Sequence, residues 1–200
     1  TGAANLEEVK NAYRVIRKFN KKICIMQCNT NYTGSLDNFN YINLNVLNKY
    51  KELFPNAIIG LSDHTPGHET VLGAIALGIK VVEKHFTDDT SRPGPDHPFS
   101  MDPKTWREMV DSTRILEESL GTSIKKIEQN ELETVVLQRR AVRAIDNIKA
   151  GEILSAKLIE FQRPCPVGAI RPNDFKLYEG KTLKNDVEAG TEIKISDIDL

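Results

Sequence analysis

Two short apolar runs, each ending in a histidine, organise this chain: Ile58-Ile59-Gly60-Leu61-Ser62-Asp63-His64-Thr65-Pro66-Gly67 and Val81-Val82-Glu83-Lys84-His85-Phe86-Thr87. An apolar run of this length that leads into polar or turn residues is typical of a buried parallel strand. Between the runs lies a helical stretch of small and apolar residues that ends at Gly78, a residue suited to the position after a helix. The sequence therefore predicts a strand-helix-strand unit whose two strands are parallel and adjacent.

The two histidines are predicted to project from the same end of these strands. Because side chains alternate along a strand, Ser62 shares a face with His64, and Glu83 shares one with His85. If that face lines a barrel, the four side chains converge at its carboxyl-terminal mouth, where barrel enzymes place their active sites. Two neutral imidazoles and water molecules would hold a divalent cation there and leave positions open for substrate. A single histidine at a strand end is more often a hydrogen-bonded structural residue, and that interpretation stays open.

The composition describes a globular protein with enough apolar material for a core. The 200 residues are 40% hydrophobic and 28% charged, with a formal net charge of -1. The 27 basic residues are dispersed among 28 acidic ones, which argues against a nucleic-acid partner. No apolar run reaches the ~18 residues of a membrane span, and no signal-peptide pattern is present. We therefore expect a cytoplasmic protein without a membrane partner.

On the amino-terminal side, a helix is predicted over residues 6–19 and a buried strand over residues 21–28. Ser35 can cap a further helix, whose apolar stripe continues until Pro55. Strands and helices thus alternate up to the central unit, which predicts an α/β architecture.

After the second histidine comes a proline-rich loop over residues 87–100, which is long enough to carry function. Asp102 and Pro103 then form the start of a helix, as N-cap and first-turn proline, and Gly121 ends it. A third helix thus follows the third strand.

The composition changes after residue 121. Residues 122–140 are polar and charged and suit a linker between domains. Residues 141–200 contain short β-favouring pieces punctuated by glycine and proline, and residues 148–154 match residues 187–193 as a weak internal repeat. We predict a first domain over residues 1–121 and a small pseudo-symmetric β domain over residues 141–200.

Several of these motifs resemble the sialic acid synthase family, which includes spore-coat polysaccharide synthases. The resemblance covers essentially the whole chain and rests on these stretches: Gln27-Cys28-Asn29-Thr30-Asn31-Tyr32, Gly60-Leu61-Ser62-Asp63-His64-Thr65, Glu83-Lys84-His85-Phe86-Thr87, Arg92-Pro93-Gly94-Pro95-Asp96 and Arg163-Pro164. It implies that residues 1–121 are the last three βα units of a TIM (β/α)8 barrel. Residues 141–200 would then be a small β-rich SAF domain, also called antifreeze-like or β-clip.

The resemblance also implies a carbon-carbon bond-forming transferase. Family members condense phosphoenolpyruvate with an N-acetylated hexosamine, typically N-acetylmannosamine, to a nine-carbon 3-deoxy-2-keto sugar acid and phosphate. By this resemblance His64 and His85 would hold Mn²⁺ or Mg²⁺, with Ser62 near the phosphoenolpyruvate. Either Glu83 or Asp96 would move protons, although two carboxylates beside a cation are as suited to a supporting role around the metal.

Other residues would bind the amino sugar. The resemblance implies that Tyr32 and Asp96 contact it, with Thr30 as a further polar contact. Arg163 would reach into the barrel of a partner subunit and touch the N-acetyl group, which implies a swapped homodimer. Taken by itself, Arg163 would be a surface arginine on a rigid loop.

This sequence departs from the family pattern in three ways. Family members commonly have Arg-Pro-Gly, then one residue and Gly, whereas Cys165 and Pro166 precede Gly168 in this chain; Thr30 stands where some members have asparagine. A barrel of this family needs eight strands, whereas three are predicted here, and the lysines that hold phosphoenolpyruvate belong to the other strands. We expect the 200-residue chain to be a piece of a longer enzyme and to be inactive alone.

Two other functions stay open from the residues themselves. Two histidines and a carboxylate would equally serve a metal-dependent aldolase or isomerase on a similar barrel. The chain could also be a noncatalytic carbohydrate-binding module in which the histidines only pack.

Overall fold

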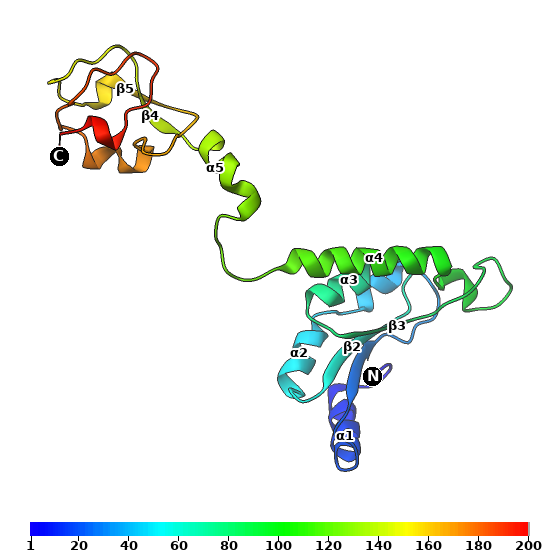
Figure 1. Ribbon diagram of the computed structural model, residues 1–200. Helices are drawn as coiled ribbons and strands as arrows, with labels where there is room; N and C mark the ends of the chain where they lie inside the picture. Colours follow the sequence, from blue (N-terminus) through cyan, green and yellow to red (C-terminus); the bar gives the residue numbers. More distant parts are fainter. Residues whose placement is uncertain (200) are drawn as a thin grey trace. The chain divides into compact units, whose positions relative to one another are not determined.

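The computed structural model describes residues 1–199, which divide into two compact units at Ser123 and Ile124 (Figure 1). Residue 200, where the predicted second domain ends, lies outside the described residues. Among the described residues, none of the helices combines the length and the apolar character that crossing a membrane requires. Each unit has its own hydrophobic core.

The first unit is built on a parallel sheet of three strands in the order β1-β2-β3. These strands are β1 (Cys24–Cys28), β2 (Ile58–Asp63) and β3 (Val81–Lys84). Helix α3 (Glu69–Ala76) connects β2 to β3, and α4 (Pro103–Leu120) runs alongside α3 (Figure 1). The predicted strand-helix-strand unit with parallel, adjacent strands is therefore confirmed.

The helix ends follow the predicted local chemistry. Asp102 accepts a hydrogen bond from the backbone N–H of Thr105 at 2.7 Å, and Pro103 opens α4. Gly78 follows α3 with a φ of +85°, a left-handed conformation in which glycine has no steric penalty. On the amino-terminal side, α1 (Leu6–Arg17) begins at a capping box formed by Asn5 and Glu8.

The prediction of a single helix between Ser35 and Pro55 is wrong, because the structure has two shorter helices in this stretch. They are the 3-10 helix η1 (Leu36–Tyr41) and the α-helix α2 (Val46–Leu53). Asn43, between them, has a φ of +50°, which a continuous right-handed helix excludes. Asn38 is buried and accepts a hydrogen bond from the Asn31 side chain at 2.9 Å. This contact ties η1 to the loop that follows β1.

Gly60 lies in the middle strand, where the backbones approach closely. A Cβ at this position would lie 2.7 Å from the carbonyl oxygen of Val81 on β3. We therefore expect Gly60→Ala to lower the free energy of unfolding of the first unit by about 1–3 kcal/mol. Urea denaturation followed by the fluorescence of Trp106, the single tryptophan, would measure it.

Gly73→Ala is the matched control for this prediction. Its added methyl would meet only the end of the Leu44 side chain, at 2.8 Å, and alanine is favoured over glycine in a helix by about 1 kcal/mol. We expect little change in stability. Equal losses in the two variants would contradict the close approach at Gly60.

The second unit contains the antiparallel pair β4 (Ala141–Ala144) and β5 (Ile159–Gln162). Part of the predicted linker is a helix, α5 (Leu132–Gln138), which is tied to this unit by a hydrogen bond of 2.9 Å from Cys165 N–H to the Val136 carbonyl. The other helical pieces of the chain are single 3-10 turns or short 3-10 helices: η2 (His97–Phe99), η3 (Gln129–Glu131), η4 (Ala156–Leu158), η5 (Pro172–Leu177) and η6 (Ile195–Asp197).

The internal repeat predicted in this unit is confirmed as a pseudo-twofold arrangement. Ile148 and Val187, equivalent in the repeat, pair with each other through two reciprocal backbone hydrogen bonds of 2.8 Å. The equivalent glycines Gly151 and Gly190 have φ values of +89° and +77°. Equivalent apolar positions are buried alike: Leu154 with Ile193, and Ile159 with Ile198. The two halves of the repeat thus share one core.

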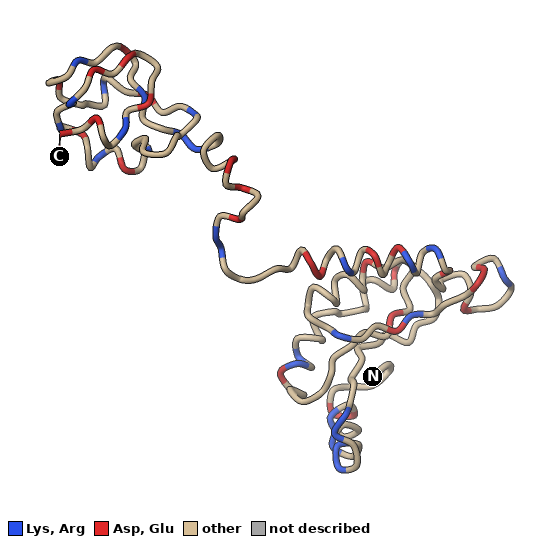
Figure 2. The backbone as a smooth tube through the Cα atoms, viewed as in Figure 1, with Lys and Arg blue, Asp and Glu red and all other residues tan. Residues whose placement is uncertain are grey.

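Charged side chains of both signs are interspersed along the backbone (Figure 2). On α4, Arg107 pairs with Asp111 and Arg114 with Glu117, at 2.7 Å and 2.6 Å. Exposed pairs of this kind contribute little stability.

Candidate metal and substrate site

The carboxyl ends of β2 and β3 bring the two predicted histidines together. The strands are in register, with Ser62 beside Glu83 and Asp63 beside Lys84, so the next step places His64 next to His85. Their ring centroids are 5.0 Å apart, with an angle of 74° between the planes. An imidazole nitrogen binds a first-row metal at about 2.1 Å, so two rings on one ion have centroids within roughly 6.5 Å. The two rings are close enough to share an ion.

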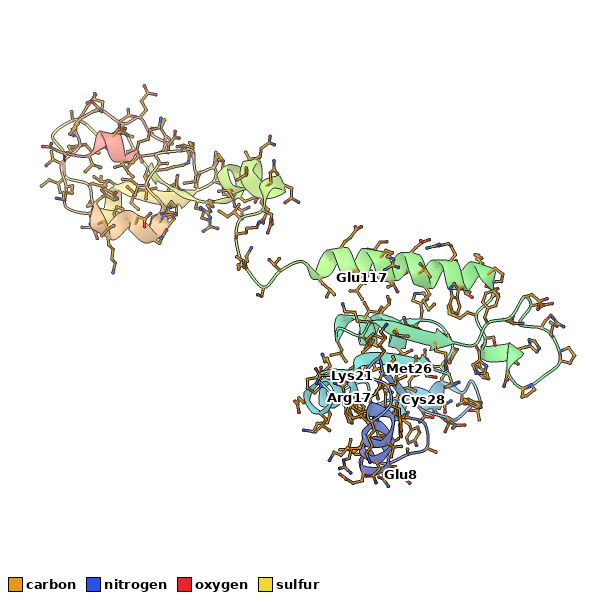
Figure 3. All side chains as sticks on the ribbon, turned by 60° about the horizontal axis from the view of Figure 1, so that its bottom comes forward. Glu8, Arg17, Lys21, Met26, Cys28 and Glu117 are labelled. Carbon is orange, nitrogen blue, oxygen red and sulfur yellow. The ribbon has the colours of Figure 1, made fainter. Side chains whose placement is uncertain are left out.

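The Nδ1 atoms of both rings face protein groups. The Sγ atom of Cys28, at the end of β1 (Figure 3), lies 3.8 Å from Nδ1 of His64. The Oδ2 atom of Asp96 lies 3.9 Å from Nδ1 of His85. Because these groups lie beside Nδ1 of each ring, the Nε2 atoms are the candidate ligands.

Within residues 1–199 no group of three or more histidine, cysteine, aspartate or glutamate side chains could hold a metal. A cation bound by His64 and His85 would have coordination positions left open beyond the ligands that the described residues supply. Open positions are typical of a reaction site, whereas a structural zinc site is closed by four protein ligands. The metal-binding role of the two histidines stays a prediction.

His64 is buried and His85 is partly exposed, with 28% of its side chain accessible. Burial lowers the pKa of His64 below its ordinary value, and the neighbouring His85 lowers it further. A hydrogen bond with the backbone of Asn29 and the charges of Asp63 and Glu83 act in the opposite direction. The net downward shift of the pKa favours the neutral imidazole, whose lone pair can bind a metal.

Two aromatic side chains surround the imidazoles. The Tyr32 ring centroid lies 4.2 Å from that of His64 and 5.6 Å from that of His85. Phe99, from the long loop after β3, lies 5.0 Å from His85. Tyr32 was a predicted substrate residue, whereas Phe99 was not identified from sequence. Its place in the proline-rich loop of residues 87–100, which was expected to carry function, could have identified it.

The hydroxyl of Ser62 donates a hydrogen bond of 2.7 Å to Oε1 of Glu83. Both side chains lie on the strand face that carries the histidines, as the alternation predicted. Asp96 is exposed, on the loop near His85. The structure thus brings together six of the eight predicted site residues: Tyr32, Ser62, His64, Glu83, His85 and Asp96.

The two remaining predicted residues lie elsewhere. Thr30 is exposed just beyond β1, against Gly2. Arg163 is exposed in the second unit, before Pro164, to which it is joined by a cis peptide bond. Their predicted contacts with substrate stay predictions.

Sequence reasoning also missed a buried ion pair next to the histidines. Lys84 Nζ lies 2.7 Å from Oδ2 of Asp63, and both side chains are essentially inaccessible to solvent. Each residue directly precedes a histidine, so the pair repeats the 21-residue spacing of His64 and His85. This repeated spacing is the feature of the sequence from which the ion pair could have been predicted.

Comparisons with known proteins match both units. The NeuB family matches residues 1–125, and the SAF domain matches residues 139–199. An N,N'-diacetyllegionaminic acid synthase of Campylobacter jejuni is 35% identical over 88% of this chain and 52% of its own length. The human N-acetylneuraminate-9-phosphate synthase is 31% identical over 92% of this chain and 50% of its own length.

Solved structures show the same similarity. The crystal structure of the spore coat polysaccharide biosynthesis protein SpsE of Bacillus subtilis is 33% identical, with a TM-score of 0.55. The match covers 100% of this chain and 60% of that one. The chain spans about half the length of the curated relatives that it matches.

Proposed function

Because the chain belongs to the NeuB family, we propose that it forms part of a phosphoenolpyruvate-dependent synthase of sugar acids. The reaction would join phosphoenolpyruvate to an N-acetylated hexosamine, such as N-acetylmannosamine, and release a nine-carbon 3-deoxy-2-keto acid and phosphate. The observation that carries this proposal is the pair of imidazoles, 5.0 Å apart at the carboxyl ends of adjacent parallel strands. A site at this edge of a parallel sheet is where α/β enzymes bind their substrates.

In this proposal His64 and His85 hold Mn²⁺ or Mg²⁺. When bound, the ion supplies Lewis acidity that makes a sugar aldehyde carbon more electrophilic. Tyr32 stands over both rings and offers a flat surface and a hydroxyl to the amino sugar. Phe99 packs beside His85 and keeps water from that side of the ring.

The carboxylates of Glu83 and Asp96 are the proposed proton carriers. Glu83 accepts a hydrogen bond from Ser62 on one oxygen, which fixes its orientation. Asp96 lies on an exposed loop and can approach both His85 and a bound sugar. The bond-forming step makes carbon 3 of phosphoenolpyruvate attack the aldehyde carbon, and water then adds at carbon 2 before phosphate leaves. A carboxylate near each centre can accept or return the protons of these steps.

The second unit would supply Arg163 to a partner subunit of a swapped homodimer. Arg163 is exposed and directly follows strand β5. A guanidinium can donate to the carbonyl oxygen of an N-acetyl group. An assembled enzyme that sediments as a monomer at assay concentration would contradict this part of the proposal.

The test of the proposed function is a chimera that joins this chain to the part of Bacillus subtilis SpsE that it does not match. With Mn²⁺, phosphoenolpyruvate and a panel of N-acetylated hexosamines, we expect stoichiometric release of phosphate at a rate on the order of 1 per second or faster for the preferred sugar. A chelator should abolish the reaction and added Mn²⁺ should restore it.

Two outcomes would contradict the proposed function. Product formation without phosphate release would favour a metal-dependent aldolase or isomerase. Saturable sugar binding by a folded chimera that turns over none of the panel would favour a carbohydrate-binding module. The same chimera with His64→Ala is the control for reaction at the SpsE part alone.

A further inference from the structure

Behind the two histidines, on the opposite face of the strands, lies the buried ion pair of Asp63 and Lys84. We propose that this pair positions the two imidazoles so that they reach one ion. The inference rests on the proposed function, because it assigns a role toward the metal site formed by His64 and His85. It makes Asp63 and Lys84 positioning residues, since alternation places them on the face that turns away from the site.

The contacts around the pair are complete. Oδ1 of Asp63 accepts from the backbone N–H and the hydroxyl of Thr65, at 3.1 Å and 2.8 Å. Oδ2 accepts from the Thr70 hydroxyl at 2.5 Å and from Lys84 Nζ at 2.7 Å. Lys84 also donates to the Thr65 carbonyl at 2.6 Å. Every lone-pair region of the carboxylate is therefore used, as a buried charge requires.

These contacts hold the backbone on both sides of His64. Asp63 precedes that histidine and Thr65 follows it, and Lys84 Nζ binds both of these residues. Lys84 in turn directly precedes His85 on the neighbouring strand. One ammonium group therefore links the segment that carries the first imidazole to the residue beside the second. A slip of one residue between the strands would turn one histidine to the opposite face.

Stability alone does not explain a pair of this kind. Two charges taken out of water lose hydration, and apolar residues of similar volume are often as stable in their place. In some proteins a buried pair instead selects one arrangement of the elements that carry it. Because a site for one ion requires its ligands in a fixed geometry, we expect the pair to affect metal affinity beyond its effect on stability.

The test is a double variant, Asp63→Asn with Lys84→Met, in the 200-residue chain. The Oδ1 atom of asparagine can still accept from Thr65, and its Nδ2 can donate to the Thr70 hydroxyl instead of accepting from it. Methionine fills the space of the lysine stem without a charge. We expect the dissociation constant for Mn²⁺, measured by calorimetry on the folded protein, to rise by about 10-fold to 100-fold. The visible absorption of bound Co²⁺ should change as well, since it reports the arrangement of the ligands.

Leu47→Ala is the control for a loss of stability without loss of positioning. Leu47 is fully buried in the core of the same unit, and its truncation should destabilise that unit by about 2–5 kcal/mol. We expect its Mn²⁺ affinity and Co²⁺ spectrum to match those of the unmodified chain. A milder variant, Thr70→Val, keeps both charges and removes one bond to Asp63; it gives a second measurement if the double variant does not fold, with a smaller weakening expected.

The outcomes separate this inference from the proposed function. Weaker Mn²⁺ binding in the Asp63 and Lys84 variant, with affinity retained in Leu47→Ala, supports positioning. Unchanged affinity in the double variant, or in Thr70→Val where only that variant folds, overturns positioning and leaves the metal site standing. Equal weakening in Leu47→Ala overturns it too, because general destabilisation would then suffice. If the unmodified chain binds no Mn²⁺, the metal site and this inference both fail.

Discussion

Mn²⁺ titrated into the His64→Ala or the His85→Ala variant should give no saturable binding over the range in which the unmodified chain is saturated. Each variant removes one of the two imidazoles that lie close enough to share an ion, and the remaining imidazole binds no more strongly than a single exposed histidine. Mutation of a residue that only hydrogen-bonds to a metal ligand lowers the metal affinity by about 10-fold to 100-fold. We therefore expect the loss of a ligand itself to lower the affinity by more than ~100-fold. Calorimetry with Mn²⁺ would measure it.

His68→Ala provides the matched control. The chain has four histidines, and His68 precedes α3 without a side-chain hydrogen bond to the helix end. This variant should bind Mn²⁺ as the unmodified chain does. If His64→Ala and His85→Ala also kept the original affinity, the histidines would be packing residues, as the carbohydrate-binding module requires.

The strand-helix-strand unit of β2, α3 and β3 could be predicted because its local sequence patterns all indicate the same structure. The apolar runs before His64 and His85 have the length of buried strands, and the residues between them have the length of one helix. Alternation along a strand then placed Ser62 and Glu83 on the side of the histidines, where they form a hydrogen bond of 2.7 Å. The N-cap at Asp102 could be predicted for the same reason, since its chemistry lies within one helical turn.

Features that depend on distant contacts could not be predicted. The break at Asn43 requires a left-handed residue in an otherwise helical pattern, and the buried contact of Asn38 with Asn31 crosses a loop. Aspartate and lysine side chains are usually exposed to solvent. The burial of Asp63 and Lys84 could therefore be predicted only from the pairing of their two strands, which brings the opposite charges together. The proposed contact of Arg163 with substrate would depend on a second subunit, and no local pattern in the sequence describes such an assembly.

Lys84→Met alone should lower the free energy of unfolding of the first unit by about 3–5 kcal/mol. The substitution leaves the Asp63 carboxylate, of which 0% of the side chain is exposed, without its counter-charge. Removing one partner of a buried pair is more damaging than replacing both, because the remaining charge has neither water nor a partner. Urea denaturation followed by the fluorescence of Trp106 on α4 would measure the loss.

Two further variants test the physical reason for this loss. Lys104→Met removes an exposed lysine whose side chain is 84% accessible, and it should change the stability by less than about 0.5 kcal/mol. Adding Asp63→Asn to Lys84→Met removes the unpaired charge, so the double variant should be more stable than Lys84→Met. If the double variant were the less stable of the two, the loss would come from packing around residue 84. A recovery of stability that is accompanied by weak Mn²⁺ binding would instead mean that the two charges serve the geometry of the histidines more than the stability of the fold.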